Sequence, residues 1–71
     1  MRNQKNRALC IGRAALGLSQ YQVAHLAGLS TNRYWRIENG WAEATPDERE
    51  AIARVLQVEP SAAFPETAAA S

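Results

Sequence analysis

Apolar and small residues recur three and four positions apart within residues 18–40, in two short runs separated by Gly28. Within each run these residues share one face of a helix. They are Val23, Ala24 and Ala27 in the first run and Tyr34 and Ile37 in the second. Gly28 can adopt the left-handed backbone conformation that ends a helix in a sharp turn. The pattern therefore predicts two helices, over residues 20–27 and 31–39, joined by a glycine-centred turn.

Polar residues at the start of each run support the same two helices. Ser19 and Gln22 form a capping-box pattern, in which two side chains satisfy backbone N–H groups that the first helical turn leaves unpaired. Ser30 can cap the second helix in the same way.

A further helix is expected before these two. Leu9, Ile11, Leu16 and several alanines predict a helix over residues 5–16, which Gly17 would end. Gly12 lies inside this pattern, where glycine costs roughly 1 kcal/mol relative to alanine in an exposed helix. Gly12 therefore either weakens the prediction or marks a place of close packing.

The segment Thr45-Pro46-Asp47-Glu48 predicts another helix, because it combines a cap, a proline suited to the first helical position and acids near the positive end of the helix dipole. This helix is expected over residues 46–56, with an apolar face formed by Ile52, Val55 and Leu56. A short helix over residues 61–64 should follow. We therefore expect an all-α domain in residues 1–64 and a flexible tail over residues 65–71.

The length and composition of the chain argue against catalysis. Seventy-one residues make one small domain, which buries about 60–65% of its unfolded surface and leaves no room for an enzyme-sized cleft. The single histidine and the single cysteine fall on different predicted helices, and the chain has no phosphate-cradling glycine loop. We expect a protein that is not an enzyme and that uses no cofactor or metal.

Charge is strongly segregated along the chain, although the net charge is only +1. Residues 1–37 carry six basic side chains and no acid. Residues 38–71, which we call the C-terminal half, carry two basic side chains against seven acidic ones. This distribution predicts that the amino-terminal part faces a polyanion, while the acidic half faces solvent or another protein.

Two further features concern where the protein resides. Cys10 is the only cysteine, so the chain can form no internal disulfide and no multi-cysteine metal site. No segment has the roughly 20 apolar residues that span a membrane, and the amino terminus lacks a secretory apolar run. We expect a cytoplasmic protein with no membrane partner.

The whole register of residues 18–40 resembles the XRE-type family of phage-repressor and Cro-like helix-turn-helix proteins. The resemblance extends from about Leu9 to Phe64 and includes LSQ at Leu18 to Gln20, the small Ala24, Gly28 and the sequence RIENG at Arg36 to Gly40. It implies a compact four- to five-helix, lambda-repressor-like domain, encoded by a bacterium or a phage, that binds double-stranded DNA.

Docking of such a motif lays the second helix in the major groove, with its outward residues near base edges. The candidates for reading bases are Thr31, Asn32, Arg33, Trp35 and Arg36, with a phosphate as the alternative contact of Arg33. Asparagine can pair with adenine, arginine with guanine, and threonine can offer a methyl group to thymine. For Trp35, packing on the domain surface and a subunit interface remain equal alternatives, and Trp41 is expected to pack on the helix of residues 46–56 or on a partner subunit.

Other side chains are expected to meet the phosphate backbone or to hold the fold. The resemblance gives Gln20 and Asn39 phosphate contacts, and Lys5, Arg7 and Ser30 complete the phosphate candidates, although Ser30 has a cap and Asn39 a helix-ending turn as local explanations. Arg13 and Glu38 match a charged pair that some family members bury between the first helix and the end of the second motif helix.

The chain departs from the family pattern in two places. Many relatives carry basic residues in the loop after the second motif helix, whereas this chain has Trp41-Ala42-Glu43-Ala44. Relatives often place glycine before the valine that follows the next helix, whereas this chain has Gln57 before Val58. The departures put phosphate contacts from that loop, and the geometry of that helix end, in doubt.

These observations lead to one principal functional hypothesis and one alternative. The principal hypothesis is a sequence-specific transcriptional regulator, most simply a repressor that binds a palindromic operator as a homodimer through its C-terminal half. The alternative is an antitoxin-like or adaptor protein whose acidic half holds a protein partner.

Overall fold

Five α-helices follow one another along residues 5–65, the part of the chain that the computed structural model describes. They are α1 (Arg7–Leu16), α2 (Gln20–Leu26), α3 (Thr31–Glu38), α4 (Pro46–Leu56) and α5 (Pro60–Ala63). No strand occurs within this described range. The expectation of an all-α fold is confirmed.

Capping residues explain where the helices differ from the sequence-based boundaries. α1 begins at Arg7, not at residue 5, because Asn6 is its N-cap and accepts a hydrogen bond from the Leu9 backbone N–H (3.1 Å). α5 begins and ends one residue earlier than expected, because Pro60 occupies its first turn and Phe64 leaves the helical conformation. α2 and α3 also end one residue earlier than expected, because Ala27 and Asn39 are their C-caps. The tail expected after residue 65 lies outside the described residues.

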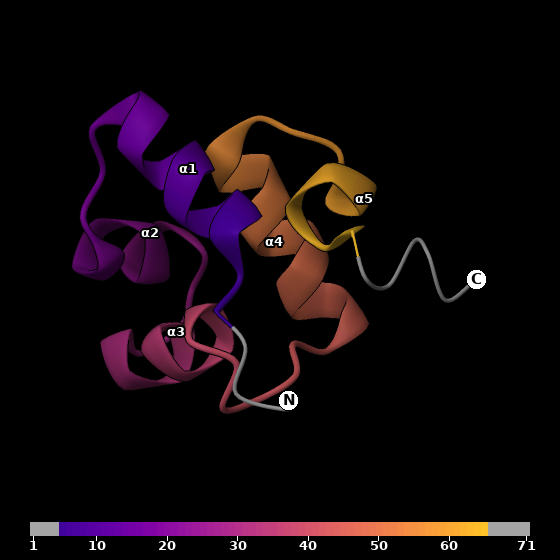
Figure 1. The fold of residues 1–71 in the computed structure, drawn as a ribbon. Helices are drawn as coiled ribbons and strands as arrows, with labels where there is room; N and C mark the ends of the chain where they lie inside the picture. The colour runs from indigo at the N-terminus through magenta and orange to yellow at the C-terminus, as the bar shows by residue number, and fades with distance from the viewer. Residues whose placement is uncertain (1–4, 66–71) are drawn as a thin grey trace.

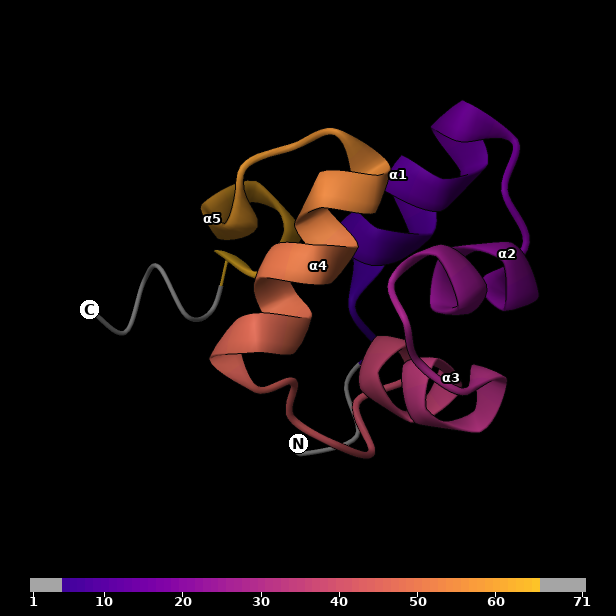
Figure 2. The same ribbon diagram turned by 180° about the vertical axis from the view of Figure 1, so that it is seen from behind.

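The other four helices lie in two groups, one on each side of α1 (Figure 1 and Figure 2). In Figure 1, α2 and α3 lie to one side of α1, and α4 and α5 lie to the other, and the view from behind in Figure 2 shows the same grouping. α1 packs against α3, α4 and α5, and α2 packs against α3 and α4. α3 consequently lies at the periphery, with one face turned inward and the other open.

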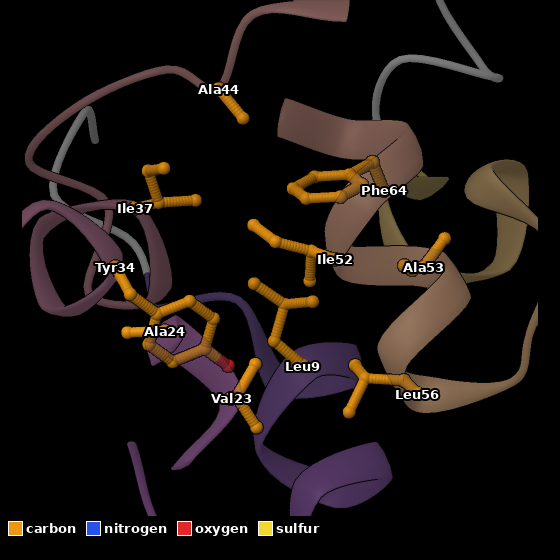
Figure 3. Close-up of a cluster of buried hydrophobic side chains, with 11 residues drawn as sticks. Leu9, Val23, Ala24, Tyr34, Ile37, Ala44, Ile52, Ala53, Leu56 and Phe64 are labelled. Atoms are coloured by element: carbon orange, nitrogen blue, oxygen red, sulfur yellow. The ribbon is translucent and has the colours of Figure 1, made fainter. Parts of the chain in front are cut away.

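A single core joins all five helices. Figure 3 shows Leu9 of α1 among Val23 of α2 and Ile52 and Leu56 of α4. The complete buried set is Leu9, Val23, Ala24, Tyr34, Ile37, Ala44, Ile52, Ala53, Leu56, Ala63 and Phe64. Burial of these side chains is the main stabilising contribution to the fold.

α1 contributes less to this core than its apolar pattern suggests. Of its large apolar residues only Leu9 is buried, whereas Ile11 is 67% exposed and Leu16 is also exposed. Gly12 lies against α4, where a Cβ atom added to it would come within 3.2 Å of Leu56 Cδ1. Of the two explanations for Gly12, the structure therefore supports close packing.

The end of α4 shows how the chain accommodates a missing glycine. Gln57 adopts a left-handed conformation (φ 62°), and the Val58 backbone N–H donates to the Ala53 carbonyl (3.0 Å). This is the helix-ending turn that glycine favours, here formed by a residue with a side chain. The turn is retained, at the cost of backbone strain.

We predict that Gln57→Gly stabilises the domain by about 0.5–1 kcal/mol, because glycine has no Cβ atom to clash with the backbone at positive φ. The free energy of unfolding, measured in urea by circular dichroism, should rise. Gln57→Ala retains Cβ and is the matched control, which should show no gain. Equal stability of the two variants would contradict the strain argument.

Candidate nucleic-acid interface

The turn between α2 and α3 has the geometry that the sequence indicates. Gly28 has a φ of 78°, and the Leu29 backbone N–H donates to the Ala24 carbonyl (2.8 Å) across the end of α2. The capping box of Ser19 and Gln22 is present at the start of α2. Ser30 caps α3, because its Oγ accepts from the Arg33 backbone N–H (3.0 Å). Local hydrogen bonds therefore fix the relative direction of the two helices.

α3 divides its residues between an inward and an outward face. Tyr34, Ile37 and Glu38 are buried against the domain. The outward side chains are Thr31, Asn32, Trp35 and Arg36, all exposed, with Trp35 at 43%. The outward face thus presents a hydroxyl, an amide, an indole and a guanidinium within two helical turns. These groups can donate and accept hydrogen bonds and can contact apolar methyl groups.

The end of α3 is closed by its own hydrogen bonds. Asn39 Nδ2 donates to the Trp35 carbonyl (2.9 Å), and the Trp41 backbone N–H donates to the Arg36 carbonyl (2.8 Å) around Gly40, whose φ is 80°. The local explanation of Asn39-Gly40 as a helix-ending turn is therefore present in the structure. Asn39 remains half-buried.

The first residues of the described chain lie beside the end of α3. The Asn6 backbone N–H donates to the Glu38 carbonyl (2.7 Å), and Asn6 Nδ2 donates to the Ala63 carbonyl of α5 (3.0 Å). Lys5 and Arg7, on either side of Asn6, are exposed. The two cations predicted to meet phosphate therefore flank a residue that is bonded to the end of α3.

The remaining phosphate candidates lie at helix starts. Gln20 opens α2 and is half-buried, whereas Ser30 precedes α3 and is exposed. No ion pair within residues 5–65 involves Lys5, Arg7 or Arg36.

An ion pair connects α1 to the buried face of α3. Arg13 Nε and Nη2 donate to Glu38 Oε1 and Oε2 at 3.1 and 2.9 Å, and Arg13 Nη1 donates to the Leu18 carbonyl (3.1 Å). The Glu38 side chain is only 1% exposed. The charged pair that the family resemblance implies is thus present and links α1 to the end of α3.

Two neighbours of Glu38 were not anticipated from the sequence. Cys10 Sγ donates to Glu38 Oε2 (2.9 Å), and burial together with this bond raises the pKa of the thiol. The buried Tyr34 hydroxyl lies close enough to Glu38 for burial and the carboxylate to raise its pKa, although no acceptor within the described residues meets hydrogen-bond geometry. Burial alone would raise the pKa of Glu38, but hydrogen bonds from Arg13 and Cys10 lower it.

Arg33, predicted among the base-reading residues, has partners inside the domain. Its Nε and Nη2 donate to Glu48 Oε2 and Oε1 at 2.9 and 2.7 Å, and Nη2 also donates to the Glu43 carbonyl (3.1 Å). The bonds from Arg33 to the carboxylate, with a smaller contribution from Thr45, hold the pKa of Glu48 at about 2, below its ordinary value. This pair could not be anticipated from the sequence, because its members are 15 residues apart along the chain and each has a plausible local role.

In the described part of the chain, no group of three or more His, Cys, Asp or Glu side chains could hold a metal ion. No helix within that part is long and apolar enough to cross a membrane.

Comparisons with known proteins identify a helix-turn-helix domain. A family model described as a helix-turn-helix domain matches residues 2–64. The crystal structure of the restriction-modification controller protein C.AhdI from Aeromonas hydrophila is similar, with a TM-score of 0.78 and 30% sequence identity, over 83% of this chain and 89% of that chain. No curated protein sequence matches the chain.

We predict that Glu38→Gln lowers the free energy of unfolding by about 3 kcal/mol, because it leaves the Arg13 guanidinium without its buried counter-charge. Urea unfolding followed by circular dichroism measures this loss. Glu50→Gln makes the same chemical change at an exposed site on α4 and should alter stability by less than about 0.5 kcal/mol. A loss below about 1 kcal/mol in Glu38→Gln would show that the pair does not hold α3.

Proposed function

The chain belongs to the XRE-like helix-turn-helix family, whose members bind DNA, and from this premise we propose that it regulates transcription by reading a specific double-stranded sequence with α3. One observation carries the proposal. The outward face of α3 presents Asn32 and Arg36, one helical turn apart and both exposed. Arg36 forms no ion pair with the rest of residues 5–65. On a docked α3, these are the residue types that recognise adenine and guanine in the major groove.

The outward residues have distinct roles in this proposal. Asn32 and Arg36 make the hydrogen bonds that discriminate bases, and Thr31 contacts a base from the first turn. Trp35 extends the surface along the same helix and covers apolar base edges such as thymine methyl groups. Arg33 is engaged with Glu48 inside the domain.

Phosphate contacts fix the register of α3 on the duplex. Lys5 and Arg7 reach the backbone beside the end of α3, and Gln20, Ser30 and Asn39 supply neutral donors at helix ends. The loop after α3 adds no cation, and its exposed Glu43 would be repelled by phosphates, so the loop makes no phosphate contact in this arrangement. With so few cations, one domain binds DNA weakly.

Weak binding by one domain favours a dimer on DNA. Two copies related by a twofold axis place two α3 helices in successive major grooves, about 34 Å apart, and so read a palindromic operator. The C-terminal half supplies the interface, through the exposed apolar side chains Trp41 and Val58 and the α5 segment. Occupation of a promoter by such a dimer represses transcription without further chemistry. Within residues 5–65 no observation favours an antitoxin or adaptor role over this one.

We predict that Arg36→Ala weakens binding to a selected operator about 10- to 100-fold, because it removes one discriminating base contact. Operators are first selected from random duplexes, and affinities are then measured by fluorescence anisotropy at about 50 and 200 mM salt. The affinity for unrelated duplex should fall much less.

Arg54→Ala is the matched control for this experiment. Arg54 is exposed on α4, so the variant loses the same charge outside the proposed reading face. It should retain the preference for the operator. A wild-type chain that is folded but binds no duplex at either salt concentration would contradict the proposed function.

We also predict that Val58→Asp weakens self-association by at least about tenfold, because it places a charge in the apolar part of the proposed interface. Sedimentation equilibrium over a range of protein concentrations gives the dimer dissociation constant. Ile11→Asp makes the same change on the exposed face of α1 and should leave the dimer intact. The reverse result would move the interface to α1.

A further inference from the structure

The contacts of Arg33 suggest a role other than touching DNA. Its guanidinium uses three hydrogen bonds within the domain, two to the Glu48 carboxylate and one to the Glu43 carbonyl. Paired bonds between a guanidinium and a carboxylate are strong and fix the relative orientation of both groups. The two side chains are only 34% and 18% exposed, so water screens the pair incompletely. This arrangement is a defined contact between α3 and the start of α4.

Glu48 is also held in place by Thr45, independently of Arg33. Its Oε1 accepts from the Thr45 backbone N–H (2.9 Å), and its own backbone N–H donates to Thr45 Oγ1 (3.2 Å). The carboxylate thus completes the capping box of α4 and binds Arg33 at the same time. Because a capping box is rigid, Arg33 is fastened to a fixed point of α4.

The position of Arg33 determines what this fastening affects. Arg33 lies in the first turn of α3, directly after Asn32 and three residues before Arg36. The other end of α3 is fastened by Glu38, which is bound to Arg13 of α1. Two contacts at opposite ends of a short helix fix its angle relative to the rest of the domain, and that angle sets where the outward side chains meet the bases.

A direct phosphate contact fits the structure less well. To reach DNA, Arg33 would have to give up three hydrogen bonds and would leave the Glu48 carboxylate beside the phosphates. Exchange of one anionic partner for another gains little, whereas an unpaired acid near the backbone is repelled.

We propose that Arg33 is a positioning residue whose clamp on Glu48 sets the angle of α3 in the major groove, and thereby the sequence selectivity of the protein. The proposal rests on the function proposed above. It concerns the ratio between operator and unrelated affinity, and it assigns Arg33 no contact with the duplex.

Two variants test the clamp. Glu48→Gln retains an acceptor for the capping box but loses the ion pair with Arg33. Glu50→Gln is its matched control, because it makes the same change in net charge on an exposed residue of the same helix. Arg33→Lys retains the charge of Arg33 but lacks the planar fork that binds both carboxylate oxygens.

Affinities for a selected operator and for an unrelated duplex are measured at about 50 and 200 mM salt, below the unfolding temperature of each variant. Relative to Glu50→Gln, we expect Glu48→Gln to lose about tenfold in the ratio of operator to unrelated affinity, comparable to one good base contact, with an unchanged salt dependence. Arg33→Lys should lose selectivity to a similar extent. A residue that only stabilised the fold would not change this ratio in folded protein.

Two outcomes would overturn the clamp. If Glu48→Gln bound both duplexes more tightly and with a steeper salt dependence than Glu50→Gln, Arg33 would be a phosphate contact that Glu48 restrains. If Glu48→Gln and Glu50→Gln had equal selectivity, the angle of α3 would not depend on the pair. Failure of the proposed function is distinct from both, because the wild-type chain itself would then bind neither duplex.

Discussion

The fold depends on a buried carboxylate. Glu38 lies at the end of α3 with its side chain 1% exposed, and a carboxylate in such a place is stable only when donors surround it. Arg13 supplies two of them and Cys10 supplies a third. The backbone carbonyl of Glu38 also accepts a hydrogen bond, from the Asn6 backbone N–H. All of these donors belong to α1 or to its cap. The requirement to satisfy one charge therefore fixes α1 against α3. The same contacts place the start of α1 beside the end of α3.

This constraint also explains why α3 can be both a core helix and an exposed one. Tyr34, Ile37 and Glu38 attach it to the domain, so the outward residues need contribute nothing to stability. Asn6 extends the same connection to α5 through the Ala63 carbonyl. A subunit interface in the C-terminal half would consequently be connected to α3 both through Asn6 and through the Arg33–Glu48 pair, which makes the spacing between two α3 helices a property of the folded core.

The sequence predicts the features that depend on neighbouring residues. The turn between α2 and α3, the capping boxes and the boundaries of α4 follow from signals within four residues, and the structure contains each of them. The apolar spacing of α1 is a weaker guide, because spacing does not reveal which side of a short helix meets the core, and Ile11 is exposed. The partners of Arg33 and Cys10 are 15 and 28 residues away. Such contacts depend on how the helices pack, and here the Arg13–Glu38 pair was expected only through the family resemblance.

Packing changes the meaning of the charge segregation seen in the sequence. Residues 1–37 have six basic side chains, but Arg13 and Arg33 are each neutralised by an acid from the C-terminal half. Of these six, Lys5, Arg7 and Arg36 are the described ones that remain to attract a duplex. Few unpaired cations mean a weak sequence-independent attraction, since that attraction scales with the number of phosphates neutralised. A domain of this kind gains affinity mainly where its base contacts fit, and two such domains on one palindrome combine modest contacts into selective binding.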